Sequence, residues 1–210
     1  MDPVEIGAVI DGIDEILTIA GVKQAVSLKN FGVWRNPGYV EGNRLKPHQS
    51  VDWYLQQGVL KSERDSQLNA NTVVSHLVSE PWRMQQNHFD VVLTNIDMNG
   101  DNQGNFVIGS AIRDIGTIIS TNRFSDLDDR SKYECIKTAA MHEVGHVFGL
   151  PRENRGHSLE YSLGPHCTNS CVMRQGLTVP HDWINFSKDR LRTGAICGSC
   201  FRDLRAYFGA

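Results

Sequence analysis

The sequence lacks a long hydrophobic run, a basic leader and any large excess of charge of one sign. No apolar stretch in its 210 residues approaches the roughly 18 residues that a membrane-spanning helix needs. Its N-terminus carries Asp2 and Glu5 where a secretion signal would have a basic region and an apolar segment. We therefore expect a cytoplasmic location, with neither secretion nor a membrane partner.

The formal net charge is only −3, so the chain has no global attraction for phosphate backbones. Residues 174–210 hold six basic against three acidic side chains, which is a mild excess without an RNA-binding motif. We therefore expect no nucleic-acid partner. With 40% apolar and 21% charged residues, the composition is that of an ordinary globular protein. We expect a monomer, large enough for one core or for two lobes that share one.

Hydrophobic periodicity predicts the main elements. Apolar residues at helical spacing predict a helix over 3–20, which Gly21 would end. The expected elements that follow are a strand over 22–33, a loop over 34–50, a helix over 68–84, strands over 89–97, 105–111 and 115–121, and a helix over about 130–148. After Gly149, glycines, prolines and cysteines increase and periodic segments become few. We therefore predict an upper subdomain over residues 1–149 and a lower one over 150–210.

The polar turn over 98–104 has to be compared with a calcium-binding loop, because Asp97, Asn99 and Asp101 have the spacing of one. An EF-hand loop needs glycine at its sixth position and a carboxylate at its twelfth. Here those positions are Asn102 and Ile108. The sequence therefore predicts an ordinary hairpin connection.

Four of the five cysteines form two tight pairs near the C-terminus, Cys167 with Cys171 and Cys197 with Cys200. Without a signal peptide, the compartment is expected to be reducing, where such pairs hold metal more often than they form disulfides. The fifth, Cys135, stands alone in a helical pattern, so we expect a small buried apolar residue.

The strongest chemical signal is the segment His142-Glu143-Val144-Gly145-His146. At 3.6 residues per turn, the two histidines lie on one face of a helix and can both reach one Zn²⁺. Glu143 is placed to take a proton from a zinc-activated water without binding the metal itself. A solvated helix face is the plain alternative, but Gly149 ends the helix where the chain must turn back.

From here the sequence resembles the archaemetzincin branch of the metzincin peptidases. The family motif H-E-x-x-H-x-x-G is followed by a histidine directly before a cysteine, then C-x-M and C-x-x-C. The corresponding residues are His142 to Gly149, His166-Cys167, Cys171-Val172-Met173 and Cys197 to Cys200. The resemblance covers roughly residues 89–200.

The resemblance implies two zinc ions per chain. It makes His142, His146 and His166 the ligands of a catalytic zinc, with Glu143 as general base and Met173 as the methionine of the turn beneath the site. It also implies a structural zinc held by Cys167, Cys171, Cys197 and Cys200. Independently, four thiolates form a closed site, whereas three histidines leave one position open for water and substrate.

The sequence departs from the family pattern in two places. The family has its third histidine three residues after the glycine, where this chain has Arg152, so residues 152–165 resemble an insertion of 14 residues. The first cysteine pair is C-x3-C, where the family usually has C-x4-C. His157 and Glu160, within the insertion, are therefore rivals of His166 as the third ligand.

The resemblance also implies the fold, an α+β, metzincin-like fold. An upper lobe with a twisted mixed sheet and two long helices would lie above a smaller, irregular lower lobe stapled by zinc. Residues 105–111 are the best candidate for the antiparallel edge strand that aligns a peptide or protein substrate in metzincins. The predicted function is that of a zinc-dependent peptidase. The alternative is a non-catalytic, zinc-stabilised binding protein, although such a protein would not need Glu143.

Overall fold

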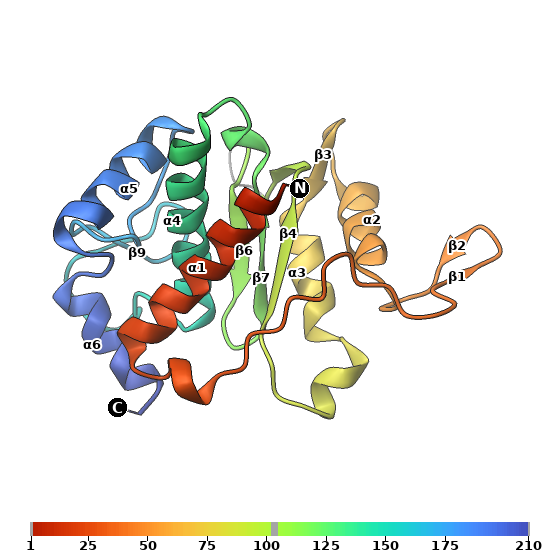
Figure 1. The fold of residues 1–210 in the computed structure, drawn as a ribbon, viewed down its shortest axis with the longest axis horizontal. Coiled ribbons are helices and arrows are strands. Elements are labelled where there is room, and N and C mark those ends of the chain that lie inside the picture. The colour runs from red at the N-terminus through yellow and green to blue at the C-terminus, as the bar shows by residue number, and fades with distance from the viewer. Residues whose placement is uncertain (1, 102–104, 210) are drawn as a thin grey trace.

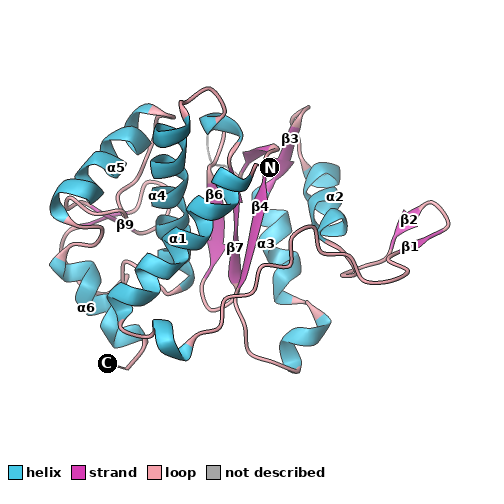
Figure 2. Cartoon of the chain, in the orientation of Figure 1, coloured by secondary structure: helices cyan, strands magenta, loops and turns pink. Residues whose placement is uncertain are grey.

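The computed structural model describes residues 2–101 and 105–209. Mixed helix and sheet predominate, as the sequence predicts, and Figures 1 and 2 show a small central sheet between two groups of helices. The elements are α1 (Pro3–Ala20), η1 (Lys23–Ala25), β1 (Val40–Glu41), β2 (Arg44–Leu45), α2 (Val51–Lys61), β3 (Gln67–Asn69), α3 (Ala70–Val78), η2 (Pro81–Met84), β4 (Asp90–Thr94), β5 (Asp97–Asn99), β6 (Gly109–Ile112), β7 (Gly116–Ser120), η3 (Asn122–Phe124), α4 (Asp129–Val147), β8 (Leu159–Glu160), β9 (His166–Cys167), α5 (His181–Thr193) and α6 (Gly198–Tyr207).

The two long helices predicted from the sequence are α1 and α4, with 18 and 19 residues. Asp2 and Glu5 form a reciprocal capping box at the start of α1, and Gly21 ends it with φ 77°, in the left-handed conformation that glycine adopts without strain. Asp128 caps α4 by accepting a hydrogen bond from the backbone N–H of Ser131. Both helices are therefore fixed at their ends by local sequence, and they pack against each other (Figure 1).

The main sheet has the strand order β4-β7-β6. Strand β7 is buried along its whole length and lies parallel to β4 and antiparallel to β6. The sheet is thus mixed, as predicted, and β6 is its antiparallel edge strand. Helix α4 packs on β6 and β7 from one side and α3 from the other, as Figure 2 shows.

The predicted strand over 22–33 is wrong. A single 3₁₀ turn over 23–25 is followed by a chain that pairs with no other strand among the described residues. Phe31 is 70% exposed and Val33 63%, so the alternating apolar residues do not line a core. Alternation predicts a strand only where a neighbouring edge is available, and here the chain runs along the surface.

Other elements differ in extent. The short hairpin β1–β2 lies inside the predicted loop, and helix α2, which the sequence analysis did not locate, follows directly. The helix predicted over 68–84 is split into β3, α3 and η2, because Pro81 begins a separate 3₁₀ turn. After Gly149, helices α5 and α6 were likewise not located from the sequence.

Two hydrophobic clusters make up the core. The larger contains buried residues of α1, α4, α5 and α6, and also Met173, so it crosses the predicted boundary at residue 149. The smaller lies on the other side of the sheet, under α2 and α3. The division into two subdomains stays a prediction.

The polar turn after β5 is only partly described, because residues 102–104 of the predicted hairpin connection lie outside the described residues. On its far side, the Val107 N–H donates to the Met98 carbonyl at 3.0 Å, in an antiparallel bridge. The Asp97 carboxylate accepts hydrogen bonds from Nε and Nη2 of Arg123, both at 2.8 Å, so its charge is already paired with that of an arginine. Among the described residues, no helix is both long and apolar enough to span a bilayer.

Candidate metal centres

Helix α4 carries the first two predicted ligands into the interior. His142 is 4% exposed and lies one turn before His146 on the same face. The helix ends at Val147, and Gly149 then reverses the chain with a φ of 71°. The Leu150 N–H donates to the Gly145 carbonyl at 2.9 Å and so satisfies the end of the helix. The two imidazoles therefore project from a rigid, well-terminated helix.

His166 joins them from a distant part of the chain. It lies on β9, which pairs with β8, and it is 5% exposed. One ligand atom from each of His142, His146 and His166 lies within 4.8 Å of the others. Neither rival joins this group: exposed His157 contacts Ser199 through Nε2, and Glu160 is the β-ladder partner of His166 but does not belong to the group.

Each of the three imidazoles has its Nδ1 on a backbone carbonyl. His142 Nδ1 lies 2.7 Å from the Val172 oxygen, His146 Nδ1 2.7 Å from the Leu150 oxygen, and His166 Nδ1 3.1 Å from the Gly164 oxygen. A carbonyl can only accept, so each Nδ1 must donate. In a neutral ring, Nε2 is then left with its lone pair free for a metal, which is the usual arrangement around metal-bound histidines.

The electrostatics also favour neutral rings. Burial and the neighbouring imidazoles lower the pKa of His142, and burial lowers that of His146 to about 3. His142 Nε2 and His146 Nε2 are 3.1 Å apart, so two lone pairs face each other. A cation between them relieves that repulsion, and tetrahedral zinc with bonds of about 2.0–2.1 Å holds two nitrogens about 3.3–3.4 Å apart.

Glu143 lies beside this group without belonging to it. It is 5% exposed, and burial raises the pKa of its carboxyl to about 8 in the absence of a metal ion. A divalent cation nearby would favour the carboxylate again. The side chain fits only because residue 109 on β6 is glycine: a Cβ there would lie 2.3 Å from Glu143 Cδ.

Met173 lies directly under the helix and is fully buried. A Cβ at Gly145 would lie 2.4 Å from the Met173 sulfur, so the glycine within the H-E-x-x-H segment makes room for it. The Met173 carbonyl also accepts the Cys167 N–H at 2.8 Å. The segment around Met173 thus contacts the segments of both candidate metal groups.

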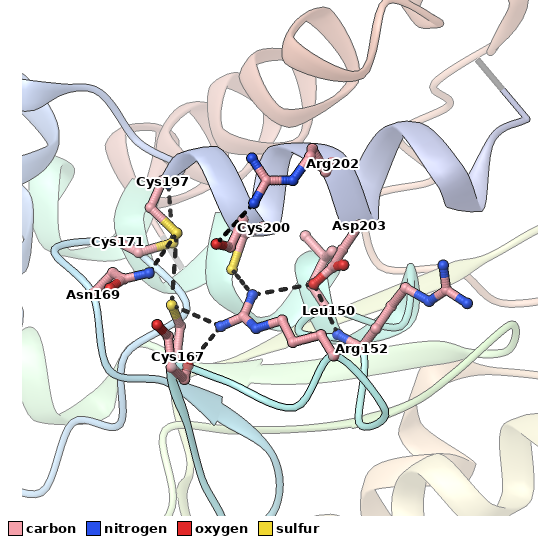
Figure 3. Close-up of polar contacts among 12 residues, drawn as sticks. Leu150, Arg152, Cys167, Asn169, Cys171, Cys197, Cys200, Arg202 and Asp203 are labelled. Carbon is pink, nitrogen blue, oxygen red and sulfur yellow. Dashed lines mark hydrogen bonds and ion pairs between the residues drawn. The ribbon is translucent and has the colours of Figure 1, made fainter.

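The four cysteines of the two pairs form a second group. All four are free thiols, and their sulfur atoms lie within 4.8 Å of one another. The Cys167 and Cys197 sulfurs are 3.7 Å apart, which is too far for a disulfide bond and close to the edge of about 3.8 Å in a zinc tetrahedron with 2.3 Å bonds. Figure 3 shows these side chains converging from the 167–171 segment and from the start of α6, which Cys197 directly precedes.

The lone cysteine, Cys135, is fully buried in the larger core cluster, as predicted. Burial raises the pKa of its thiol to about 11, so it packs as an apolar side chain.

A third group that the sequence analysis did not find comprises Glu80, His88 and Asp90. His88 Nε2 lies 2.8 Å from Glu80 Oε1, and Arg83 pairs with Asp90 at 2.9 Å. The Arg83–Asp90 ion pair ties η2 to β4, and His88 and Glu80 add a hydrogen bond beside it.

A cavity of about 880 Å³ opens over the histidine group. His142, Glu143, His146 and His166 line it, together with residues 106–111 on the side of the sheet edge. Both ends of the 152–165 segment contribute to its wall, through residues 152–154 and 163–165. The predicted insertion thus borders the candidate site.

Comparison with known proteins bears directly on this arrangement. Over 104 residues, or 50% of the chain, the sequence is 34% identical to the archaemetzincin of Nanoarchaeum equitans (strain Kin4-M). The resemblance to archaemetzincins is confirmed. The match covers 45% of that archaemetzincin, so the chain corresponds to about half of its length. No family model matches the chain.

The archaemetzincin likeness extends to the fold. A crystal structure of archaemetzincin from Methanopyrus kandleri aligns with a TM-score of 0.51 and 24% identity, over 71% of this chain and 70% of that one. This confirms the α+β fold expected from the sequence. A crystal structure of the archaemetzincin from Archaeoglobus fulgidus, complexed with malonate, aligns with a TM-score of 0.44 and 23% identity, over 66% of this chain and 70% of that one.

Proposed function

We propose that the protein is a zinc-dependent peptidase. The observation that supports it best is the histidine group: three imidazoles, each with Nδ1 on a carbonyl, turn toward one another beside a buried carboxylate at an open cavity. A purely structural metal site would need neither the cavity nor Glu143. The donor set of three histidines with one position left open is that of catalytic zinc sites.

In this proposal His142, His146 and His166 hold the catalytic zinc. When bound, zinc would supply Lewis acidity, polarising the scissile carbonyl and lowering the pKa of water. Glu143 accepts the proton of the attacking water and passes it to the leaving amine. Met173 forms the apolar floor under the histidines, where its contact with Gly145 holds the helix.

Strand β6 is the proposed binding edge for a peptide substrate. It has a partner only on its β7 side in the described sheet, and its residues line the cavity next to Glu143. An extended peptide can add to such an edge through backbone hydrogen bonds, which places its carbonyls in a fixed register.

The cysteine group, in this proposal, holds a structural zinc. Thiolates favour zinc among the common divalent ions, and a closed four-sulfur site has no position for substrate. The four free cysteines fit a reducing compartment, so we propose the cytoplasm as the location. We further propose a monomer that acts on peptides, without a nucleic-acid or membrane partner.

The function is tested by incubating zinc-loaded protein with a mixed peptide library and identifying the products by mass spectrometry. We expect cleavage that stops when a chelator removes the metal and returns when zinc is restored. The cleavage sites would also separate endopeptidase from aminopeptidase action. A fully zinc-loaded, folded protein that cleaves no peptide would favour the zinc-stabilised binding protein instead.

Metal content should be two zinc ions per chain, because the histidine and cysteine groups are separate. Elemental analysis of the Cys167→Ser variant should give one, since a serine hydroxyl is a poor zinc ligand. The matched control is Cys135→Ser, which alters a buried cysteine outside both groups and should leave the count at two in protein that folds. A parent protein with one zinc, unchanged in Cys167→Ser, would contradict the structural site.

A further inference from the structure

Arg155, in the segment that the archaemetzincin pattern lacks, lies against the cysteine group. Its Nη1 donates to the Cys200 sulfur at 3.2 Å, and its Nη2 donates to the Cys167 sulfur at 3.1 Å. Only 6% of its side chain is exposed. The dashed lines at Cys167 and Cys200 in Figure 3 mark these contacts. A buried guanidinium therefore touches two of the four candidate zinc ligands.

The guanidinium is fully engaged in this position. It has five N–H donors, and five acceptors lie within hydrogen-bond distance. Besides the two sulfurs, these are Asp203 Oδ2 at 3.1 Å, the His157 carbonyl at 3.0 Å and the Ser158 carbonyl at 2.6 Å. Such a complete set fixes both the position and the plane of the group, which a lysine could not reproduce.

The negative charge of the proposed zinc site makes a cation beside its sulfurs favourable. Four thiolates around one Zn²⁺ carry a net charge of about −2 in a largely buried position. Leaving such charge without a nearby cation is costly, and N–H groups that donate to sulfur lower its electron density. The Asn169 side-chain amide and the Cys197 N–H also donate to sulfurs of the group, both at 3.4 Å, but they are neutral.

Arg155 also connects the cysteine group to the cavity. Its own loop supplies the His157 and Ser158 carbonyls, and the Ser158 carbonyl additionally accepts the Thr168 N–H at 3.1 Å. The Asp203 carboxylate that holds the guanidinium also accepts the Arg152 N–H at 3.1 Å. The start of the 152–165 segment, which lines the cavity, is thereby tied to the metal group.

We propose that Arg155 is a positioning residue for the structural zinc, compensating the charge of its thiolates and fastening the 152–158 segment to the site. This inference rests on the proposed four-cysteine zinc site. It assigns a role to the segment that a sequence comparison with archaemetzincins treats as an insertion.

The test uses the full chain with Co²⁺ in place of zinc. Thiolate-to-Co²⁺ charge-transfer absorption reports only on the cysteine group, because the histidine group contains no sulfur. In Arg155→Met, loss of the N–H···S bonds makes the sulfurs stronger donors, so the band should move to lower energy. Zinc transfer to a chelator should accelerate, because losing a hydrogen-bonding partner of metal ligands typically lowers metal affinity by about 10–100-fold. Arg155→Lys should fall between this variant and the parent.

The matched control is Arg202→Met. Arg202 is exposed on the same helix as Cys200 and contacts Ser199 at 3.4 Å without touching a sulfur, so its variant should match the parent in both measurements. If Arg155→Met does not fold, Arg155→Lys carries the test. If the folded Arg155 variant has the same band position and the same transfer rate as the parent, the role of Arg155 is overturned, while the structural zinc site is not. A parent protein without the charge-transfer band would overturn the structural zinc itself.

Discussion

Replacing Glu143 by glutamine is expected to abolish peptide cleavage while leaving the zinc content unchanged. Glutamine has the same shape, so it fits against Gly109 on β6, but it cannot accept the proton of the attacking water. General-base assistance typically raises the rate by about 10²–10⁴-fold, so kcat should fall by at least about 100-fold. The measurement is kcat on the best peptide from the library, together with elemental analysis of the same sample.

The matched control for this prediction is Glu41→Gln, which makes the same chemical change on exposed strand β1, away from the cavity. It should cleave at the parental rate. If Glu143→Gln cleaves peptides as well as the parent, Glu143 is not the base and the proposed mechanism fails. If the variant loses zinc, Glu143 acts as a ligand, which its place outside the histidine group argues against.

Replacing His166 by alanine is expected to remove one of the two zinc ions. Only His142 and His146 would then remain at the site, and two protein ligands hold zinc far less tightly than three. The loss of affinity should exceed the roughly 100-fold that removing a hydrogen-bonding partner of a ligand can cause. A chelator competition titration measures it, and the zinc at the four cysteines provides an internal reference.

His157→Ala is the matched control, because it makes the same substitution within the 152–165 segment. His157 is exposed and its Nδ1 lies 2.8 Å from the Arg155 carbonyl, so its loss should leave both zinc ions bound. The reverse outcome, with zinc retained in His166→Ala and lost in His157→Ala, would mean that the segment supplies the third ligand.

The sequence alone was sufficient for features that depend on neighbours within one or two turns. The helix over 3–20 was predicted correctly because its capping box and its terminating glycine are local. The approach of His142 and His146 follows in the same way from helical periodicity. The archaemetzincin resemblance was accessible for a related reason, since its motif consists of short spacings that survive in this chain.

Tertiary structure decided everything that depends on distant segments. The 22–33 segment alternates like a strand, but none of the sheets in the described part of the chain pairs with it. The structure brings His166, and neither His157 nor Glu160, into the group with His142 and His146, because β9 lies against α4. Sequence spacing within a long loop does not determine where the loop returns.

Gly109 and Arg155 show, at the candidate site, the same limit of prediction from sequence. Gly109 is needed because β6 passes so close to Glu143 that a Cβ would collide with its side chain. Arg155 reaches the cysteine group because its loop folds onto α6. A glycine in a strand and an arginine in a polar loop are common, and nothing in their own sequence surroundings indicates such contacts. Gly145 was the exception that could have been found, because a glycine between the two candidate metal ligands of a buried helix indicates close packing. The sequence thus determined which chemical groups the protein has, and the packing of distant segments determined which of them meet.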